Sequence, residues 1–529
     1  MGLTDIRRRV EALPPSVFTG ISRGIEKEGL RVRADGELAQ SPHPAGLGSA
    51  LTHPRITTDF SESQLELITG VHTSIDGLLG ELAELHRVVY RHLGEELVWA
   101  ASMPCRLPPD DGIPIARYGR SNLACLKEVY RRGIAHRYGR RMQAISGIHY
   151  NFSLADEAWA RLRPRDSAVG PEIHRDQGYL ALIRNFRRHS WLLLLLLGSA
   201  PAACASFVEG RKHRLATWEG GGTVYAGGAT SLRMGTLGYQ SDAQAALGVS
   251  FNDMRGYATI LQRAMTEPYP PYEAIGLRDA HGYRQLSTAL LQIENEFYGK
   301  IRPKRVTRPG ERPLHALGER GIEYVEVRCL DVDPFMPCGI DAAAIRLLDV
   351  FLFHCLLSDS PPESAAEVAA VSRNQKLIAE EGRDPQTRLE RAGASIAPAD
   401  YALDLLRECE PVAAALDDAA GGNGHREALA NAQRSLGDLS SLPSSRVLDA
   451  ITRSHGGSFT AFALAQSRRH RDQTLARPLS PEAEASYAEL AARSLEEQKR
   501  IEAADDVPFE AYRRRYLEQD LLSGPHFAL

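Results

Sequence analysis

The spacing of apolar residues changes along this chain from strand-like to helical. Apolar residues alternate or cluster, as they do in β-strands, over residues 24–33, 56–69, 142–153, 286–298 and 321–330. Spacings of three and four predict helices over residues 75–100, 122–134 and 172–199. The first 23 residues predict a short helix and a turn, and the Gly- and Thr-rich residues 220–240 predict a loop.

From about residue 340 onward the helical period dominates. Helices are expected over residues 347–357, 364–382, 400–416 and 482–504. Residues 417–445 contain Gly421-Gly-Asn-Gly424 among many Ser, Asp and Ala residues, which predicts a surface loop. We therefore expect a sheet-containing catalytic region over residues 1–340. A mainly helical region, residues 341–529, should pack on it within one integrated domain.

The composition is that of an ordinary globular protein, with 43% hydrophobic and 25% charged residues in 529. A net charge of −4 provides no basic surface for nucleic acid. The most apolar run, Trp191–Leu197, is far shorter than the ~20 residues that span a bilayer, and the N-terminus has no apolar signal core. Seven scattered cysteines without a CxxC pair argue against a disulfide framework or a zinc ribbon, and they favour a reducing cytoplasm.

Two glutamates on the first predicted strand are the sharpest chemical signal. Glu26 and Glu28 are two residues apart, so on a strand their side chains point to the same face. At ~4 Å and an effective dielectric constant of ~20, two like charges repel by about 4 kcal/mol. Such a pair faces water, shares a proton or holds a cation, and the two residues alone leave that choice open.

Other predicted strands add further acidic residues. Taken singly, each could lie on the wet face of an antiparallel sheet, and a lone histidine is more often structural than a ligand. Four strands that all present carboxylates would repel one another unless cations bind between them. The residues concerned are Asp59, Glu62, Glu66, His149, Glu294, Glu296, Glu323 and Glu326.

This ligand chemistry favours Mg²⁺ or Mn²⁺ over zinc, because oxygen ligands with a single imidazole suit hard cations. Mg²⁺ held by a few carboxylates commonly shares its other positions with substrate phosphates. The chain contains no Walker A, GxGxxG, HExxH or GxSxG motif. The residues therefore indicate a metal–nucleotide enzyme without a P-loop. Arg131, Arg233, Arg328 and the basic run Lys300–Arg305 could bind phosphate or carboxylate, or be surface charges.

Long ordered blocks of the sequence resemble the glutamate–cysteine ligase family, and within it the proteobacterial (type 1) group, also called γ-glutamylcysteine synthetase. The resemblance is dense from about residue 24 to 340 and thinner in the C-terminal third. The blocks are Glu26–Val32, Gly46–His53, Ile56–Phe60, Met142–Ser153, Ala229–Arg233, Leu237–Tyr239, Leu291–Glu296, Ile301–Thr307 and Gly321–Arg328.

The resemblance implies an ATP-dependent ligase that joins L-cysteine to the γ-carboxylate of L-glutamate through a γ-glutamyl phosphate. It implies Mg²⁺ as cofactor, with Mn²⁺ able to serve, and ATP as co-substrate. The implied fold is α+β and similar to that of glutamine synthetase: a curved, mainly antiparallel sheet forms a funnel and is wrapped by helices. We expect a cytoplasmic monomer without nucleic-acid or membrane partners.

Site residues follow from the resemblance position by position. Family members place metal ligands at Glu26, Glu28, Asp59, Glu66, His149 and Glu326. Arg328 matches an arginine that faces the phosphoryl group, and Glu26 and Glu326 join it as catalytic residues. Gly29 departs from the family pattern, because a threonine is common there. The implied substrate-binding residues are Arg233 and Tyr239, with Tyr130, Phe60, Tyr298, Arg131 and Gln143 as further candidates.

Two other functions remain open at this point. The first is a related carboxylate–amine ligase that uses a different amine acceptor, because the residues define the chemistry more firmly than the acceptor. The second is a nucleotide- or metal-binding protein without turnover. The intact set of acidic residues together with Arg328 argues against the second.

Overall fold

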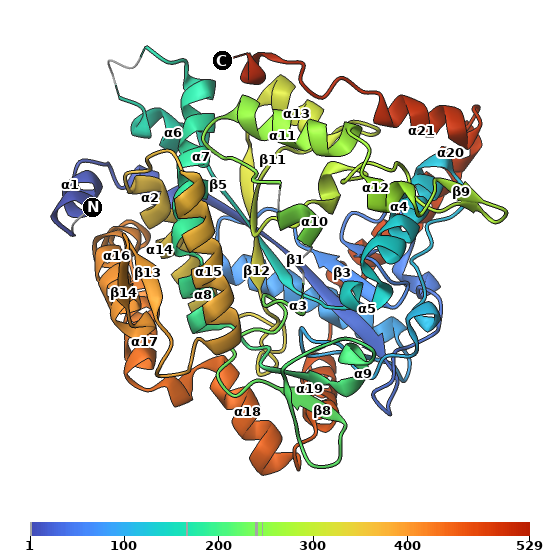
Figure 1. Ribbon diagram of the computed structural model, residues 1–529, viewed down its shortest axis with the longest axis horizontal. Coiled ribbons are helices and arrows are strands. Elements are labelled where there is room, and N and C mark those ends of the chain that lie inside the picture. The colour runs from blue at the N-terminus through green and yellow to red at the C-terminus, as the bar shows by residue number, and fades with distance from the viewer. Residues whose placement is uncertain (1–2, 165–167, 239–241, 246, 529) are drawn as a thin grey trace.

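An antiparallel sheet crosses the centre of the molecule, and helices surround it (Figure 1). The computed structural model describes residues 3–164, 168–238, 242–245 and 247–528. Within them, seven strands follow the order β11-β12-β5-β1-β3-β2, with β4 pairing with β1. The strands are β1 (Ile21–Val32), β2 (Ile56–Thr58), β3 (Gln64–Ile68), β4 (Leu97–Val98), β5 (Ile148–Leu154), β11 (Ile301–Lys304) and β12 (Tyr324–Leu330). The predicted α+β class is confirmed.

The long strand β1 organises the sheet, because it pairs with β5 on one side and with β3 and β4 on the other. Its odd-numbered residues face the helices: Arg23 pairs with Asp349 of α14 (Ala342–Leu357), and Lys27 contacts His86 of α3 (Ile75–His92). Its even-numbered residues, which include Glu26, therefore point to the opposite face of the sheet.

Other helices of the N-terminal region surround this sheet, and α7 and α8 contact its strands β11 and β12. The bounds are α1 (Leu3–Glu11), α2 (Ser16–Thr19), α4 (Asn122–Tyr138), α5 (Arg140–Gln143), α6 (Asp156–Leu162), α7 (Pro171–His189), α8 (Trp191–Leu197), α9 (Ala205–Val208), α10 (Asp242–Ala245), α11 (Met254–Thr266), α12 (Pro270–Glu273) and α13 (Pro313–Arg320). Short strands form two further sheets, β6 (Ala202–Cys204) with β8 (Thr223–Tyr225) and β7 (Ala216–Thr217), and β9 (Arg278–Asp279) with β10 (Gly282–Tyr283).

The C-terminal region is helical, as predicted, and returns to the N-terminal region. Helix α16 packs on α1 and α2, α20 on α3, and α21 on α4. These long-range contacts join the two ends of the chain in one structure, with the C-terminal helices beside α4 in Figure 1. The bounds are α15 (Ala365–Glu381), α16 (Pro398–Ala420), α17 (Gly424–Gly437), α18 (Pro443–Ser454), α19 (Phe459–Leu475), α20 (Pro481–Ala504), α21 (Phe509–Leu517), and the hairpin β13 (Leu389–Arg391) with β14 (Ala394–Ile396).

The predicted loop over residues 417–445 is wrong, because helices α17 and α18 occupy most of it. Gly421 ends α16 with a left-handed φ of 75°, a conformation that glycine adopts without strain. The carboxylate of Asp417 then accepts hydrogen bonds from the backbone N–H groups of His425 and Arg426 at the start of α17. Burial of Leu429 and Leu436 holds α17 on the core, so tertiary packing outweighs the Gly- and Ser-rich composition.

The long helix predicted over residues 172–199 is two helices. It ends at His189 and resumes at Trp191, and the hydroxyl of Ser190 between them accepts a hydrogen bond from Gln375 of α15. The leucine-rich α8 is buried in the main hydrophobic core. None of the described helices is long and apolar enough to cross a membrane.

Three predicted elements have different bounds. Residues 56–69 form the hairpin β2–β3 rather than one strand, because Ser61 turns the chain with hydrogen bonds to Pro114 and Ser63. The helix from residue 75 ends at His92, before β4, and the segment from residue 142 starts with the end of α5. Residues 286–298 form no strand in the described structure. Apart from an isolated bridge between Ala289 and Pro268, they contain the 3-10 turn Glu294–Glu296, because buried arginines bind the two glutamates.

Candidate active site

The carboxylates on the even-numbered face of β1 meet residues of both neighbouring strands. In the strand register, His149 of β5 lies beside Glu26, and Glu66 of β3 lies beside Glu28. The His149 ring is 3.3 Å from Glu26 through Nδ1 and 3.5 Å from Glu28 through Nε2. The predicted face-sharing of Glu26 and Glu28 therefore becomes a cluster built from three strands.

Strand β12 adds a carboxylate and a guanidinium on the other side of His149. Glu326 Oε1 is 3.7 Å from His149 Nδ1, 3.1 Å from Arg328 Nη1 and 3.4 Å from Lys304 Nζ. Asn151 of β5, paired with Glu326 in the register, donates its side-chain amide to Glu26 at 2.9 Å. Glu326 therefore joins the cluster as part of an ion-pair network.

The pKa values of the carboxylates are shifted in opposite directions on the two sides of this cluster. Burial, and after it the charge of Glu26, raises the pKa of Glu66 well above its ordinary value. Burial and then Asp59 raise the pKa of Glu28. Burial alone would raise the pKa of Glu326, but Lys304 and Arg328 lower it well below its ordinary value. Lys304 and Arg328 therefore supply positive charge to Glu326 on β12, whereas Glu66 on β3 lacks enough positive charge nearby.

Residues from β1, β3 and β5 together fit a divalent cation. One ligand atom each of Glu26, Glu66 and His149 lies within 4.8 Å of the others, close enough to share an ion. Glu326 Oε2 is buried without a hydrogen-bond partner among the described residues, so a further lone pair is available. Carboxylates with one imidazole are the donor set that suits Mg²⁺ or Mn²⁺.

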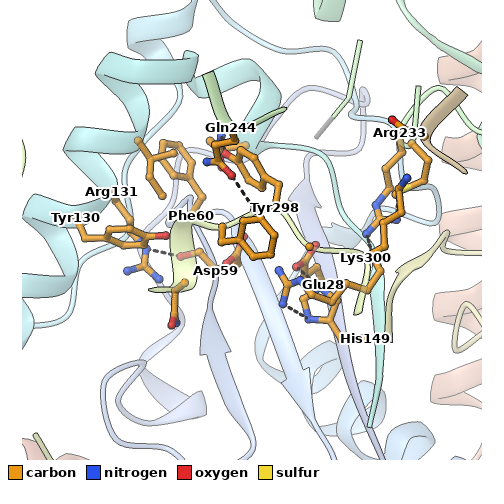
Figure 2. Close-up of a pocket in the computed structure, with 18 residues that line it drawn as sticks. Glu28, Asp59, Phe60, Tyr130, Arg131, His149, Arg233, Gln244, Tyr298 and Lys300 are labelled. Carbon is orange, nitrogen blue, oxygen red and sulfur yellow. Dashed lines mark hydrogen bonds and ion pairs between the residues drawn. The ribbon is translucent and has the colours of Figure 1, made fainter. Parts of the chain in front are cut away.

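A cavity of about 280 Å³ opens beside this cluster and is lined by most of the predicted substrate residues. Figure 2 shows Tyr130 and Arg131 at one end, Arg233 and Lys300 at the other, and His149 with Glu28 at its floor. Glu26, Glu66 and Glu326 lie outside its lining, and Tyr239 falls outside the described residues. The predicted residues in the lining are Glu28, Asp59, Phe60, Tyr130, Arg131, Gln143, His149, Arg233, Tyr298 and Arg328.

The two ends of the cavity are held differently. At one end, the Arg131 guanidinium stacks 4.7 Å from the centre of the Tyr118 ring and donates to the backbone carbonyl of Asp59. In the middle, the amide of Gln143 donates to the Tyr298 hydroxyl at 3.1 Å. At the other end, Arg233 donates to the backbone carbonyl of Arg328 at 2.8 Å.

Some lining residues were not singled out from the sequence. Gln244 lies in the four-residue helix α10 and Asn295 in the 3-10 turn Glu294–Glu296, and both elements are too short to show a periodicity in the sequence. Lys300 stood in a basic run that the sequence left ambiguous, and burial lowers its pKa to about 8. Conversely, Glu62, Glu294 and Glu296 are structural. Glu62 accepts backbone hydrogen bonds from His43 and Arg117, and the other two pair with arginines.

Solved structures share this architecture. A glutamate–cysteine ligase from Francisella tularensis in complex with AMP superposes with a TM-score of 0.89 at 36% identity, covering 94% of this chain and 98% of that one. A bifunctional glutathione synthetase from Pasteurella multocida gives a TM-score of 0.70 at 26% identity, covering 90% of this chain and 57% of that one. Fold and site thus define an ATP-dependent ligase.

The sequence comparison narrows this class. The family model for glutamate–cysteine ligase matches residues 10–378. A glutamate–cysteine ligase from Bordetella parapertussis is 49% identical over 502 residues, 94% of each chain. One from Azotobacter vinelandii is 48% identical over 497 residues, 93% of each chain. The chain belongs to the glutamate–cysteine ligase family.

Proposed function

We propose that this chain joins L-cysteine to the γ-carboxylate of L-glutamate at the expense of ATP, giving γ-glutamylcysteine, ADP and phosphate, the first step of glutathione biosynthesis. The observation that carries the proposal is the near-complete alignment of this chain with glutamate–cysteine ligases at 46–49% identity. The AMP in the Francisella structure supports the use of a nucleotide at this fold. The cavity beside the carboxylate cluster is the proposed site of the reaction.

Activation of glutamate is the first chemical task, because a carboxylate is a poor electrophile until it becomes an acyl phosphate. Two anions, the γ-carboxylate and the terminal phosphate, must approach each other in line. Arg328 is suited to face them. Burial would lower its pKa, but Glu326 and Glu28 raise it above its ordinary value, so it keeps its charge at every physiological pH. Its guanidinium would stabilise the charge on the transferring group.

The carboxylate cluster would hold the metal that accompanies ATP. When bound, Mg²⁺ or Mn²⁺ supplies positive charge to phosphate and carboxylate oxygens. Glu26, Glu66 and His149 form the tightest group of ligand atoms, and Glu28, Asp59 and Glu326 are further ligands in the proposal. Asn151 and Arg328, which contact Glu26 and Glu326, would orient these carboxylates.

The second task is to hold the cysteine amine near the acyl phosphate. Positioning of this kind can lower the activation barrier by ~7–11 kcal/mol. Phe60, Tyr130 and Tyr298 would form an aromatic wall for the small thiol side chain, and Arg233 would take a carboxylate. A missing atom in an apolar pocket discriminates by only ~1–3 kcal/mol, so 2-aminobutyrate should be accepted as a poorer substrate.

The test is phosphate release by the purified chain with glutamate, cysteine, Mg²⁺ and ATP, each omitted in turn, with the product identified by mass spectrometry. We expect full release and γ-glutamylcysteine only in the complete mixture. Faster release with another amine would make the chain a related ligase with a different acceptor. Absence of any ATP consumption would contradict an enzymatic function.

We further propose that the chain acts as a monomer in a reducing cytoplasm. All seven cysteines are free thiols, and most are buried, which is compatible with that compartment. We also propose that residues 1–340 and 341–529 unfold as one integrated domain, since α16, α20 and α21 pack against α1, α3 and α4. Light scattering and a single calorimetric transition would check the two proposals.

A further inference from the structure

Arg233 is anchored to strand β12, which carries Arg328, by contacts within the protein. Its guanidinium lines the cavity although only 2% of the side chain is exposed. Its Nη2 donates to the backbone carbonyl of Arg328, and its Nη1 is 3.7 Å from Asp331 Oδ1, three residues further along. Gly147 leaves the room for this arrangement, because a Cβ there would lie 2.1 Å from Arg233 Nη2.

Asp331 is itself held in place by two other segments. Its carboxylate accepts hydrogen bonds from the backbone N–H of Ser199 and from the hydroxyl of Ser231, each at 3.0 Å. The same Ser231 hydroxyl accepts the backbone N–H of Met234, next to Arg233. The Asp331 side chain is fully buried. One carboxylate therefore joins the end of β12, the segment after α8 and the loop that carries Arg233.

Asp331 is absent from the described lining of the substrate cavity. It lines instead a second cavity of about 300 Å³, whose lining does not include Arg233. Its influence on a substrate therefore has to pass through the guanidinium. Because a guanidinium binds a carboxylate through a planar fork, its orientation decides how well it binds.

We propose that Asp331 is a positioning residue that orients Arg233 to bind the carboxylate of the amino-acid substrate. The inference rests on the proposed function, which assigns Arg233 to the cysteine pocket. Asp331 balances the charge of the buried Arg233 guanidinium and restricts its rotation. The hydrogen bond from Arg233 to the Arg328 carbonyl fixes the distance of the guanidinium from β12.

The first variant is Asp331→Asn, which keeps the shape but loses the charge. Its single amide oxygen can still accept the backbone N–H of Ser199, while its NH2 group can donate to the Ser231 hydroxyl oxygen. We expect the KM for cysteine to rise about ten-fold, equivalent to ~1.4 kcal/mol. The KM for ATP and kcat should change less than two-fold. Asp333→Asn is the matched control: its carboxylate accepts the backbone N–H of Phe335, and no change in the cysteine KM is expected.

A double-mutant cycle separates positioning from general damage. In the Arg233→Ala background, Asp331→Asn should add less than two-fold to the cysteine KM. Additive effects would overturn the proposal. So would a lower cysteine KM in Asp331→Asn, because Asp331 would then compete with the substrate for Arg233.

A milder variant keeps the test decisive if Asp331→Asn folds poorly. Ser231→Ala removes the hydrogen bond to Asp331, together with the one from the Met234 N–H, and leaves the ion pair, so the cysteine KM should rise about two- to four-fold. An unchanged KM would overturn the proposal. A wild-type chain that makes no γ-glutamylcysteine would overturn the proposed function and this inference together. An active wild type with an additive cycle would overturn this inference alone.

Discussion

The two faces of β1 both bury charge, but they neutralise it in different ways. On the odd-numbered face, Arg23 and Arg31 pair with Asp349 and Glu96 at 2.7 Å each. On the even-numbered face, Glu26 and Glu28 meet further carboxylates and one histidine. One face is complete within the fold, and the other has an excess of anions that an external cation can balance.

Lys27, on the helix-facing side of β1, also has its polar partner within the fold. Its ammonium contacts the His86 ring at 2.8 Å, and burial lowers the Lys27 pKa to about 8. Burial also lowers the pKa of His86 well below its ordinary value, so the ring stays neutral and can accept the hydrogen bond. The comparison teaches that buried charge alone does not mark a site. Charges of one sign that outnumber their partners do.

The largest effect is expected when a carboxylate on the even-numbered face of the sheet is neutralised. Glu26→Gln or Glu326→Gln should lower kcat/KM by about 10³-fold or more, ~4 kcal/mol, because each removes a charge at the proposed metal and phosphoryl site. Steady-state kinetics over a Mg²⁺ series should also show weaker metal dependence. Glu323→Gln, an exposed neighbour at the start of β12, is the control and should retain activity. Near-normal turnover in either site variant would remove the metal-site interpretation.

The next largest effect is expected when a buried ion pair on the helix-facing side of β1 is removed. Asp349→Ala leaves Arg23 buried without its partner and also removes the acceptor of the Tyr150 hydroxyl, so stability should fall by about 3–5 kcal/mol. Urea unfolding measures this loss, and kcat per folded molecule should stay near the wild-type value. Asp404→Ala, which removes a surface ion pair with Arg391, should cost less than about 1 kcal/mol. Equal losses in both variants would contradict the contrast.

Mg²⁺ binding to the carboxylate face should be measurable as increased stability, without any reaction taking place. At about 100 times its dissociation constant, Mg²⁺ should stabilise the wild-type fold by ~2.7 kcal/mol, seen as a rise in Tm. Glu66→Gln should lose most of this shift, because Glu66 belongs to the tightest group of ligand atoms. Glu323→Gln should keep it. A Glu66→Gln variant with the full shift would place the metal elsewhere.

The smallest effect is the pH dependence that Asp349 contributes on the helix-facing side. Burial would raise the pKa of Asp349, but the charge of Arg23 and the hydrogen bonds from its partners together outweigh burial, and the net pKa is lowered. Asp349 therefore contributes stability above its unfolded pKa of about 3.9, and this contribution is lost as the pH falls through the folded pKa. The stability difference between wild type and Asp349→Asn should be constant from about pH 5 to 7 and narrow below about pH 4. Urea unfolding across this range measures it, and a constant difference at all pH values would contradict it.

Local pattern was sufficient where a side chain's role depends on its own strand. The spacing of Glu26 and Glu28 predicted a shared face, and the register with β3 and β5 bears this out. Glu326 and Arg328 were likewise predicted to share a face, and their side chains are 3.1 Å apart. The period of two residues is a property of the backbone, so a sequence expresses it directly.

Local pattern failed where a distant partner decides the outcome. Glu294 and Glu296 looked like further site carboxylates until Arg312 and Arg137 proved to be their buried partners. Residues 417–445 looked like a loop, but packing against the core makes them helical. Asp331 carried no sequence signal at all, since its relation to Arg233 spans 98 residues of sequence and exists only in the folded chain.

The sequence by itself determined the family, the α+β class and the residue types gathered around the reaction, because these are written in long ordered blocks and in strand periodicity. Only the tertiary structure decided which charges are paired. Ion pairs form between residues far apart in the chain, and an electrostatic interaction depends on distance and burial in space rather than on order along the sequence.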